Sequence, residues 1–280
     1  MTAAIRSLCT AALLLASALP AQAIVGGTDT PLFGHVDNGV QVTDSWVLTA
    51  RHVGYTVGGS YGNGYGSAMI AARYDLGGGP TLVNDLALLR LATPIAAPAL
   101  TLLADLLPVG SHNPPLAVTI ATGSNQLPRG YAFAEMPEVI DQVDVGTATA
   151  PNVQPVRWLL AYNAGNTAPY VQGGDSGGGL FWDHVSDSTG GLLMGITSAQ
   201  ITFDGGGFGS SFVQLAAYRS WITATMGNDL ADAQVALWAS AVPEPTTWAL
   251  WLTGAGLLAG RRAARGRATR AMAYSSSLPA

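Results

Sequence analysis

The sequence contains a single cysteine, Cys9, and no lysine. Because Cys9 lies in a segment that we expect to be removed, the mature protein must fold without disulfide bonds. Residues 24–242 hold six arginines against 16 carboxylates, which leaves a net charge of −10. Such an acidic domain repels phosphate backbones, so nucleic acid is excluded as a partner.

The sequence also lacks a compact group of aspartates and asparagines with the spacing of a calcium loop. The acids are scattered, as they are on a solvated surface. We expect no metal site and no cofactor, while the sequence leaves calcium dependence open.

The amino terminus has the features of a signal peptide. Residues 1–23 contain one early arginine, an apolar run and Ala21-Gln22-Ala23, a small-x-small pattern of the kind that signal peptidase cuts. Signal peptidase is thus an expected partner, and the exported chain would begin at Ile24. The stretch 24–242 is long enough for one large or two small domains.

Few windows of the exported part have a helical period. Short apolar or alternating runs such as SWVLTA, LALLRL and LLMGITSA recur between glycine-rich breaks, which predicts an all-β sandwich or barrel. The exception is an amphipathic helix predicted near the end of this part. Residues 229–240 follow it as a second amphipathic piece, which continues the helix or packs separately. The first helix is predicted from five residues on one face: Leu215, Tyr218, Trp221, Ile222 and Met226.

The stretch QGGDSGGG at 172–179 places one serine among many glycines. It is compatible with a polar surface turn, which uses the same residue types. It is equally compatible with a nucleophile, because a serine between glycines is uncrowded and backbone N–H groups can converge beside it.

A serine nucleophile needs a base and a group that orients the base. Among the four histidines, His52 ends the apolar run SWVLTARH and so extends from a rigid strand. Asp85 opens the apolar run NDLALLRL, where a buried carboxylate requires hydrogen-bond donors. These two are the candidate partners of Ser176.

Four motifs occur in order, and a fifth closes the domain: IVGG at 24–27, WVLTARHV at 46–53, NDLALLRL at 84–91, GGDSGGGL at 173–180 and FVQLAAYRSWI at 212–222. Together they resemble the trypsin- and chymotrypsin-like serine protease family over almost all of residues 24–242. The resemblance implies two antiparallel six-stranded β-barrels with a C-terminal helix and an active site between the barrels. It also implies an exported serine endopeptidase that acts on proteins or peptides through an acyl-enzyme.

The resemblance assigns roles to individual residues. Ser176 would be the nucleophile, His52 the general base and then acid, and Asp85 the group that holds the imidazole. The backbone amides of Gly174 and Ser176 would form the oxyanion hole. Asp175 would pair with the new α-ammonium of Ile24, so that signal-peptide removal also activates the enzyme.

The same alignment places the specificity pocket. Tyr170 would form its floor, and its wall would consist of Ser198, Ala199 and Gln200. Since no acid stands at the floor, the expected substrate side chain before the cleaved bond is apolar or small.

The chain departs from the family in one respect that affects stability. The family usually has a cysteine directly after the histidine, bridged to an earlier one, whereas Val53 stands there in this chain and Arg51 replaces a small residue. The barrels must therefore depend more on packing.

Two other functions remain open. A protease fold that has lost catalysis can serve as a surface binding protein. The sequence GDSGG also satisfies the G-x-S-x-G elbow of α/β-hydrolase esterases, although that fold requires an aspartate and then a histidine after the serine, and only His184 follows.

The segment 243–270 resembles a PEP-CTERM sorting signal of Gram-negative bacteria. VPEP at 242–245 precedes an apolar stretch, 246–260, and then five arginines. As a helix that stretch is about 22 Å long, short of the roughly 30 Å hydrocarbon core. The resemblance implies transient tethering at the inner membrane, cleavage by an exosortase-like transpeptidase, and release to the cell surface or matrix. Retention of the segment as a membrane anchor stays open. No role is assigned to residues 271–280.

Overall fold

The computed structural model of the chain divides into two compact units, Met1–Ala239 and Ser240–Ala280. The predicted signal peptide, and the sorting signal from residue 243 onward, lie outside the described residues. Within the described part, no helix is long and apolar enough to cross a membrane. The structure describes residues 24–77, 83–124, 127–144, 150–162, 167–203 and 207–241.

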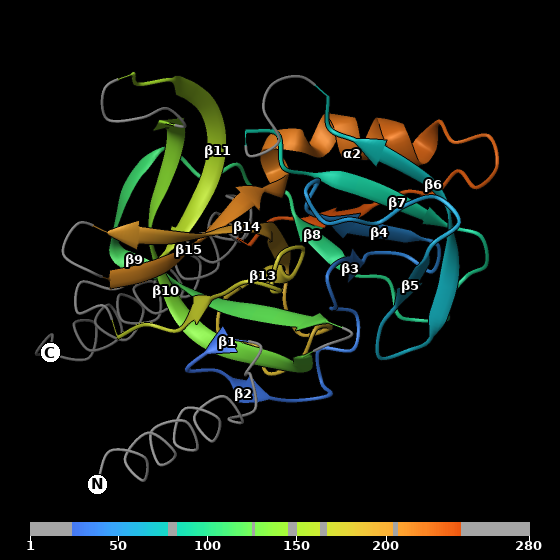
Figure 1. Cartoon of the computed structure of the whole chain (residues 1–280), viewed down its shortest axis with the longest axis horizontal. Helices are drawn as coiled ribbons and strands as arrows, with labels where there is room; N and C mark the ends of the chain where they lie inside the picture. The colour runs from blue at the N-terminus through green and yellow to red at the C-terminus, as the bar shows by residue number, and fades with distance from the viewer. Residues whose placement is uncertain are drawn as a thin grey trace, which may run out of the picture. The chain divides into compact units, whose positions relative to one another are not determined.

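The first barrel is an antiparallel sheet with the strand order β3-β4-β7-β6-β5 (Figure 1). In β4 all four residues are buried, as expected where one face of a strand lines a barrel and the other meets a second layer. An isolated bridge between Val36 and Val40 extends the sheet at its β3 edge. The strands are β3 (Val40–Gln41), β4 (Trp46–Thr49), β5 (Ser60–Gly62), β6 (Ser67–Asp75) and β7 (Ala87–Leu91).

The second barrel is a closed antiparallel ring of six strands in the order β13-β9-β10-β11-β15-β14, because β14 pairs again with β13. Closure leaves no free edge within the ring. The six-stranded barrel predicted from the resemblance is therefore present here, whereas the described pairings of the first barrel join five strands. The strands are β9 (Gly110–Ser124), β10 (Leu127–Asp144), β11 (Val153–Ala161), β13 (Gly179–Trp182), β14 (Leu193–Phe203) and β15 (Gly207–Gln214).

Residues 24–29 form two short strand pairs, one of them with a strand of this barrel. Strand β1 (Ile24–Val25) pairs with β12 (Tyr170–Val171), and β2 (Thr28–Asp29) pairs with β10. The first pair places Ile24 opposite Val171, which directly precedes the glycine-rich stretch at 172–179.

The predicted C-terminal helix is present. A 3-10 turn, η1 (Leu215–Tyr218), leads into α2 (Arg219–Gly227), and Leu215, Ile222 and Met226 are buried. Figure 1 shows α2 beside β6 and β7, on the first barrel.

Residues 229–240 differ from the prediction. They form bends and a short strand, β16 (Leu237–Ala239), which runs parallel to β8 (Thr101–Leu103). The buried carboxylate of Asp229 accounts for the turn, because it accepts hydrogen bonds from the backbone N–H groups of Ala231 and Asp232. It also binds the Tyr74 hydroxyl at 2.6 Å and Arg90 Nε at 3.0 Å, and so ties this segment to the first barrel.

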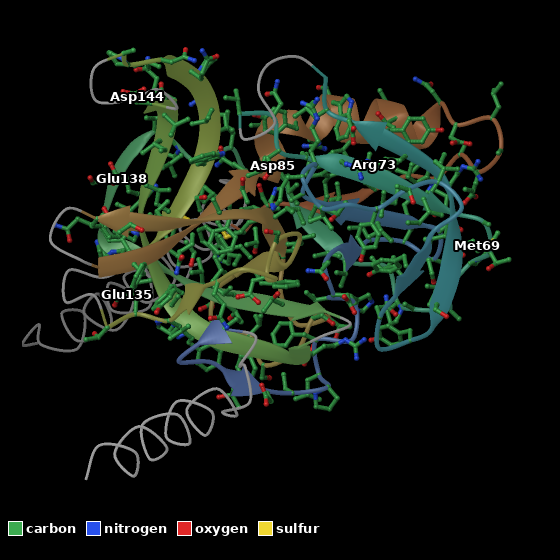
Figure 2. The ribbon with its side chains drawn as sticks, viewed as in Figure 1. Met69, Arg73, Asp85, Glu135, Glu138 and Asp144 are labelled. Carbon is green, nitrogen blue, oxygen red and sulfur yellow. The ribbon has the colours of Figure 1, made fainter. Side chains whose placement is uncertain are left out.

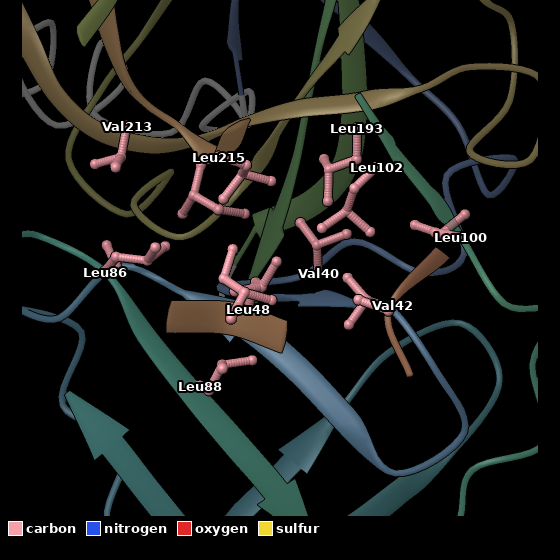
Figure 3. Packing of buried hydrophobic residues seen from close by; sticks show 14 of the residues in the cluster. Val40, Val42, Leu48, Leu86, Leu88, Leu100, Leu102, Leu193, Val213 and Leu215 are labelled. Atoms are coloured by element: carbon pink, nitrogen blue, oxygen red, sulfur yellow. The ribbon is translucent and has the colours of Figure 1, made fainter. Parts of the chain in front are cut away.

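Apolar side chains from both barrels share one cluster (Figure 3), and a separate cluster that includes Val47, Tyr61 and Ile70 lies in the first barrel. Leu48 and Leu88 from the first barrel lie in the same cluster as Leu193 and Val213 from the second. Each fully buried aliphatic side chain contributes roughly 1.5–3 kcal/mol. This shared core holds the two barrels together without a disulfide bond, as the cysteine content requires.

Candidate active site

The three predicted triad residues converge where the two barrels meet. Strands β4 and β7 pair with Thr49 opposite Ala87, so the turn with His52 and the approach to β7 with Asp85 lie together. Ser176 comes from the second barrel, in the turn between β12 and β13. In Figure 2 Asp85 is labelled between the strands of the two barrels.

The hydrogen bonds form a continuous chain. His52 Nδ1 lies 2.8 Å from Asp85 Oδ2, and His52 Nε2 lies 2.7 Å from Ser176 Oγ. Since an ionised carboxylate only accepts, Nδ1 carries the proton and Nε2 is free to accept the proton of the serine. The backbone N–H of His52 also donates to Asp85 Oδ1 at 3.0 Å, which fixes the loop as well as the ring.

Burial differs along this chain of groups. Asp85 is fully buried, while His52 and Ser176 are partly exposed, so a substrate can reach the serine but not the carboxylate. The hydrogen bond with Asp85 raises the pKa of His52, against the opposing effect of burial. A carboxylate that raises the basicity of an imidazole beside a serine hydroxyl is the arrangement needed for general-base catalysis.

Ser198 makes a contact that the sequence analysis missed. Its hydroxyl donates to Asp85 Oδ2 at 2.6 Å. The register of β14 against β15 shifts between Thr197 and Ala199, and such a bulge redirects the intervening side chain. Asp85 thus has three donors, which offset the cost of burying its charge.

The loop around Ser176 is shaped by glycines in the left-handed region. Gly174 has φ +105° and Gly177 has φ +87°. Within the part of the chain that the structure describes, the N–H groups of Gly174 and Ser176 have no acceptor. Gly174 is exposed and Ser176 is partly exposed. Their N–H groups are therefore available to bind a developing oxyanion.

Asp175, the predicted partner of the Ile24 ammonium, is buried beneath this loop. Its carboxylate accepts from the N–H of Gln172 at 2.7 Å and from Thr122 Oγ1 at 3.3 Å. Burial raises the pKa of Asp175 to about 7. In the full chain the nitrogen of Ile24 belongs to a peptide bond, so the ion pair between Ile24 and Asp175 stays a prediction for a chain that begins at Ile24. The pairing of β1 with β12 places Ile24 opposite Val171, next to Gln172.

The predicted specificity residues come from β12 and β14. The ring of Tyr170 stacks on Phe208 with a centroid distance of 4.9 Å, and Gln200 is exposed. Strand β15 lies opposite, and Ser211 Oγ donates to the carbonyl of Ala199. The predicted floor and wall carry no carboxylate, so none of them supplies a partner for a substrate cation.

Arg73, which is labelled in Figure 2, lies on β6 and binds the loop that carries His52. Its Nη1 donates to the carbonyls of Val53 at 2.9 Å and Tyr55 at 2.5 Å, and its Nη2 donates to the carbonyl of Arg51. A planar guanidinium offers several donors in a fixed geometry, so one side chain can bind carbonyls on both sides of His52.

A second histidine–serine pair exists and has a different character. His35 Nδ1 lies 2.7 Å from Ser188 Oγ, and His35 Nε2 lies 2.7 Å from the carbonyl of Pro98. Both side chains are fully buried, and burial lowers the pKa of His35. No substrate can reach Ser188, so this pair fills a structural role.

No group of His, Cys, Asp or Glu that could hold a metal ion occurs among the residues that the structure describes.

Two curled antiparallel sheets and a C-terminal helix, with a Ser-His-Asp arrangement between the sheets, are the architecture of the trypsin-like serine protease fold. Residues 17–222 match the trypsin family model, and the chain belongs to the trypsin family.

Solved structures of similar fold include a mutant of human heparin binding protein (CAP37). It is 17% identical, with a TM-score of 0.51, over 73% of this chain and 97% of that one. Human heparin binding protein itself is 18% identical, with a TM-score of 0.49, over 72% of this chain and 96% of that one. No curated protein matches the chain in sequence. This fold is all-β and therefore excludes the α/β-hydrolase alternative.

Proposed function

We propose that the protein is a serine endopeptidase. The observation that supports this most directly is the continuous hydrogen-bond chain from Asp85 through His52 to the part-exposed Ser176. Membership of the trypsin family implies peptide substrates.

In this proposal His52 Nε2 takes the proton of Ser176 as its oxygen attacks the peptide carbonyl. The negative charge that develops on the carbonyl oxygen faces the N–H groups of Gly174 and Ser176. Asp85 stabilises the imidazolium without taking up its proton. His52 then gives the proton to the leaving amine. In the second half of the reaction His52 takes a proton from water as the water attacks the acyl group, and returns a proton to the Ser176 oxygen as the acyl group leaves.

A fluorescent phosphonate that reacts with activated serines tests this function. We expect the secreted protein to be labelled and to cleave peptides from a random library, and a Ser176→Ala variant with the same circular dichroism spectrum to do neither. An unlabelled, correctly folded wild-type protein would refute the proposed activity.

Activity should depend on pH through His52. The imidazole must be neutral to accept the serine proton, and its pKa is raised by Asp85. Activity is therefore full above that pKa and falls as the pH drops through it, with a midpoint at or above the usual value of about 6.5. A profile of kcat/KM against pH measures the midpoint; an acid limb centred well below pH 6 would contradict the assignment.

We further propose that substrates carry an apolar or small side chain before the cleaved bond. Cleavage after arginine would place a cation against Tyr170 and Ala199 with no partner among the predicted pocket residues. In the same peptide library, products ending in apolar or small residues should dominate, and efficient cleavage after arginine or lysine would refute this preference.

A binding protein with the same fold is the second candidate. The first structure named above is a mutant of human heparin binding protein, and heparin is the ligand that this candidate would bind. The net charge of −10 over residues 24–242 opposes it, because binding a polyanion requires basic residues. Retention on immobilised heparin at 0.15 M salt, together with absence of phosphonate labelling, would favour this candidate over the protease.

We also propose export and transient attachment to the inner membrane of a Gram-negative bacterium. The support is the sequence pattern of residues 1–23 and 243–270. The exported form should begin with Ile24 and end near residues 242–245, which amino-terminal sequencing and the intact mass establish.

A further inference from the structure

One side chain from the first barrel reaches the nucleophile loop of the second. Asn38 lies in the bend before β3, and its Nδ2 donates to the carbonyl of Gly174 at 2.6 Å and to the carbonyl of Ser176 at 3.1 Å. These partners are 136 and 138 residues away in the sequence. The contact therefore crosses between the two barrels at the loop that carries the proposed oxyanion donors.

Asn38 is itself held in place. Its N–H donates to Asp37 Oδ1 at 2.8 Å, and its carbonyl accepts from Thr49 Oγ1 at 2.5 Å. Thr49 is a buried residue of β4, three positions before His52. The backbone of Asn38 is thus bonded to β4, the strand that leads to the proposed base.

The two carbonyls bound by Asn38 belong to the residues whose N–H groups are the proposed oxyanion donors, Gly174 and Ser176. A single amide nitrogen therefore fixes the backbone on the carboxyl side of both donors. The loop also approaches Asn38 closely, since a Cβ at Gly177 would lie 2.6 Å from the carbonyl carbon of Asn38. Donors held in advance cost no reorganisation when charge develops on the substrate, whereas mobile ones do.

We propose that Asn38 is a positioning residue that preorganises the oxyanion hole. This inference rests on the proposed protease function and assigns Asn38 no contact with the substrate. Its loss should affect the transition state more than substrate binding, because the oxyanion forms only as the serine attacks.

Steady-state kinetics of Asn38→Ala and Asn38→Asp test this. Removing an oxyanion donor lowers kcat by about 10²–10³-fold, and loss of positioning should lower it less, by roughly 10-fold, with KM within about twofold of wild type. The aspartate should be the more damaging, since its carboxylate only accepts and faces two carbonyl oxygens. The affinity for a peptidyl trifluoromethyl ketone, which forms an oxyanion with the serine, should fall by the same factor as kcat/KM.

Asn152→Ala is the matched control, because Asn152 is an exposed asparagine whose contacts are with Asp144 and Gln154. It should leave kcat and KM within about twofold of wild type. The inference is overturned if both Asn38 variants keep wild-type kcat, or if they raise KM and leave kcat unchanged.

Hydrogen–deuterium exchange separates this inference from the protease function. In Asn38→Ala, exchange in the segment 172–180 should increase while exchange in β14 stays at the wild-type level. Equal exchange in 172–180 of the two proteins would overturn the positioning role, even with an active enzyme. If the wild type neither reacts with the phosphonate nor cleaves peptides, the protease function fails, and the exchange data still decide whether Asn38 orders the loop.

Discussion

Replacement of Asp85 by asparagine is expected to lower kcat by about 10⁴-fold with the fold intact. The carboxylate accepts three hydrogen bonds, from the backbone N–H and Nδ1 of His52 and from Ser198 Oγ. An asparagine amide turned toward the ring would donate to Nδ1 and so select the tautomer with the proton on Nε2. That tautomer cannot accept the proton of Ser176.

Peptide-cleavage kinetics near pH 8 measure the effect, and phosphonate labelling should slow in parallel. Asp187→Asn is the control, because Asp187 lies in an exposed turn, where it accepts from Thr189 and Gly190. An Asp85→Asn enzyme within tenfold of wild type would show that Asp85 does not orient the base.

Replacement of Gly177 by alanine is expected to lower the free energy of unfolding by about 2–5 kcal/mol and to abolish phosphonate labelling. Gly177 has φ +87°, which costs an alanine roughly 1–2 kcal/mol. The added Cβ would also lie 2.7 Å from Thr49 Oγ1 and against the Asn38 carbonyl. The nucleophile loop would have to move away from the first barrel.

Gly173→Ala provides the matched comparison, since the same methyl group four residues earlier meets no atom within 4 Å. Urea denaturation of both variants should show a large shift of the midpoint for residue 177 and almost none for residue 173. Equal midpoints for the two variants would mean that the close approach to Asn38 does not occur in solution.

Local sequence patterns were sufficient for an all-β prediction and for the C-terminal helix, whereas the two-barrel architecture was implied by the family resemblance. The short apolar runs predicted strands, and the five apolar residues from Leu215 to Met226 predicted a helix that the structure contains. The segment 229–240 was expected as an amphipathic piece, yet Asp229 turns the chain and β8 pairs with its end. That outcome depends on Tyr74 and Arg90, which are remote in sequence, so local periodicity could not predict it.

The sequence by itself determined the identity of the candidate triad, because Ser176, His52 and Asp85 each stand in a motif whose order along the chain is specific. Only the tertiary structure revealed the contacts that hold the triad. Ser198 reaches Asp85 through a bulge in β14, Arg73 binds the His52 loop from β6, and Asn38 crosses from the other barrel. These are hydrogen bonds between single side chains and distant backbone or carboxylate groups. Such bonds leave no local sequence pattern. The contact of Arg73 depends on strand pairing within the first barrel, and those of Ser198 and Asn38 depend on the relative position of the two barrels, which the shared core fixes.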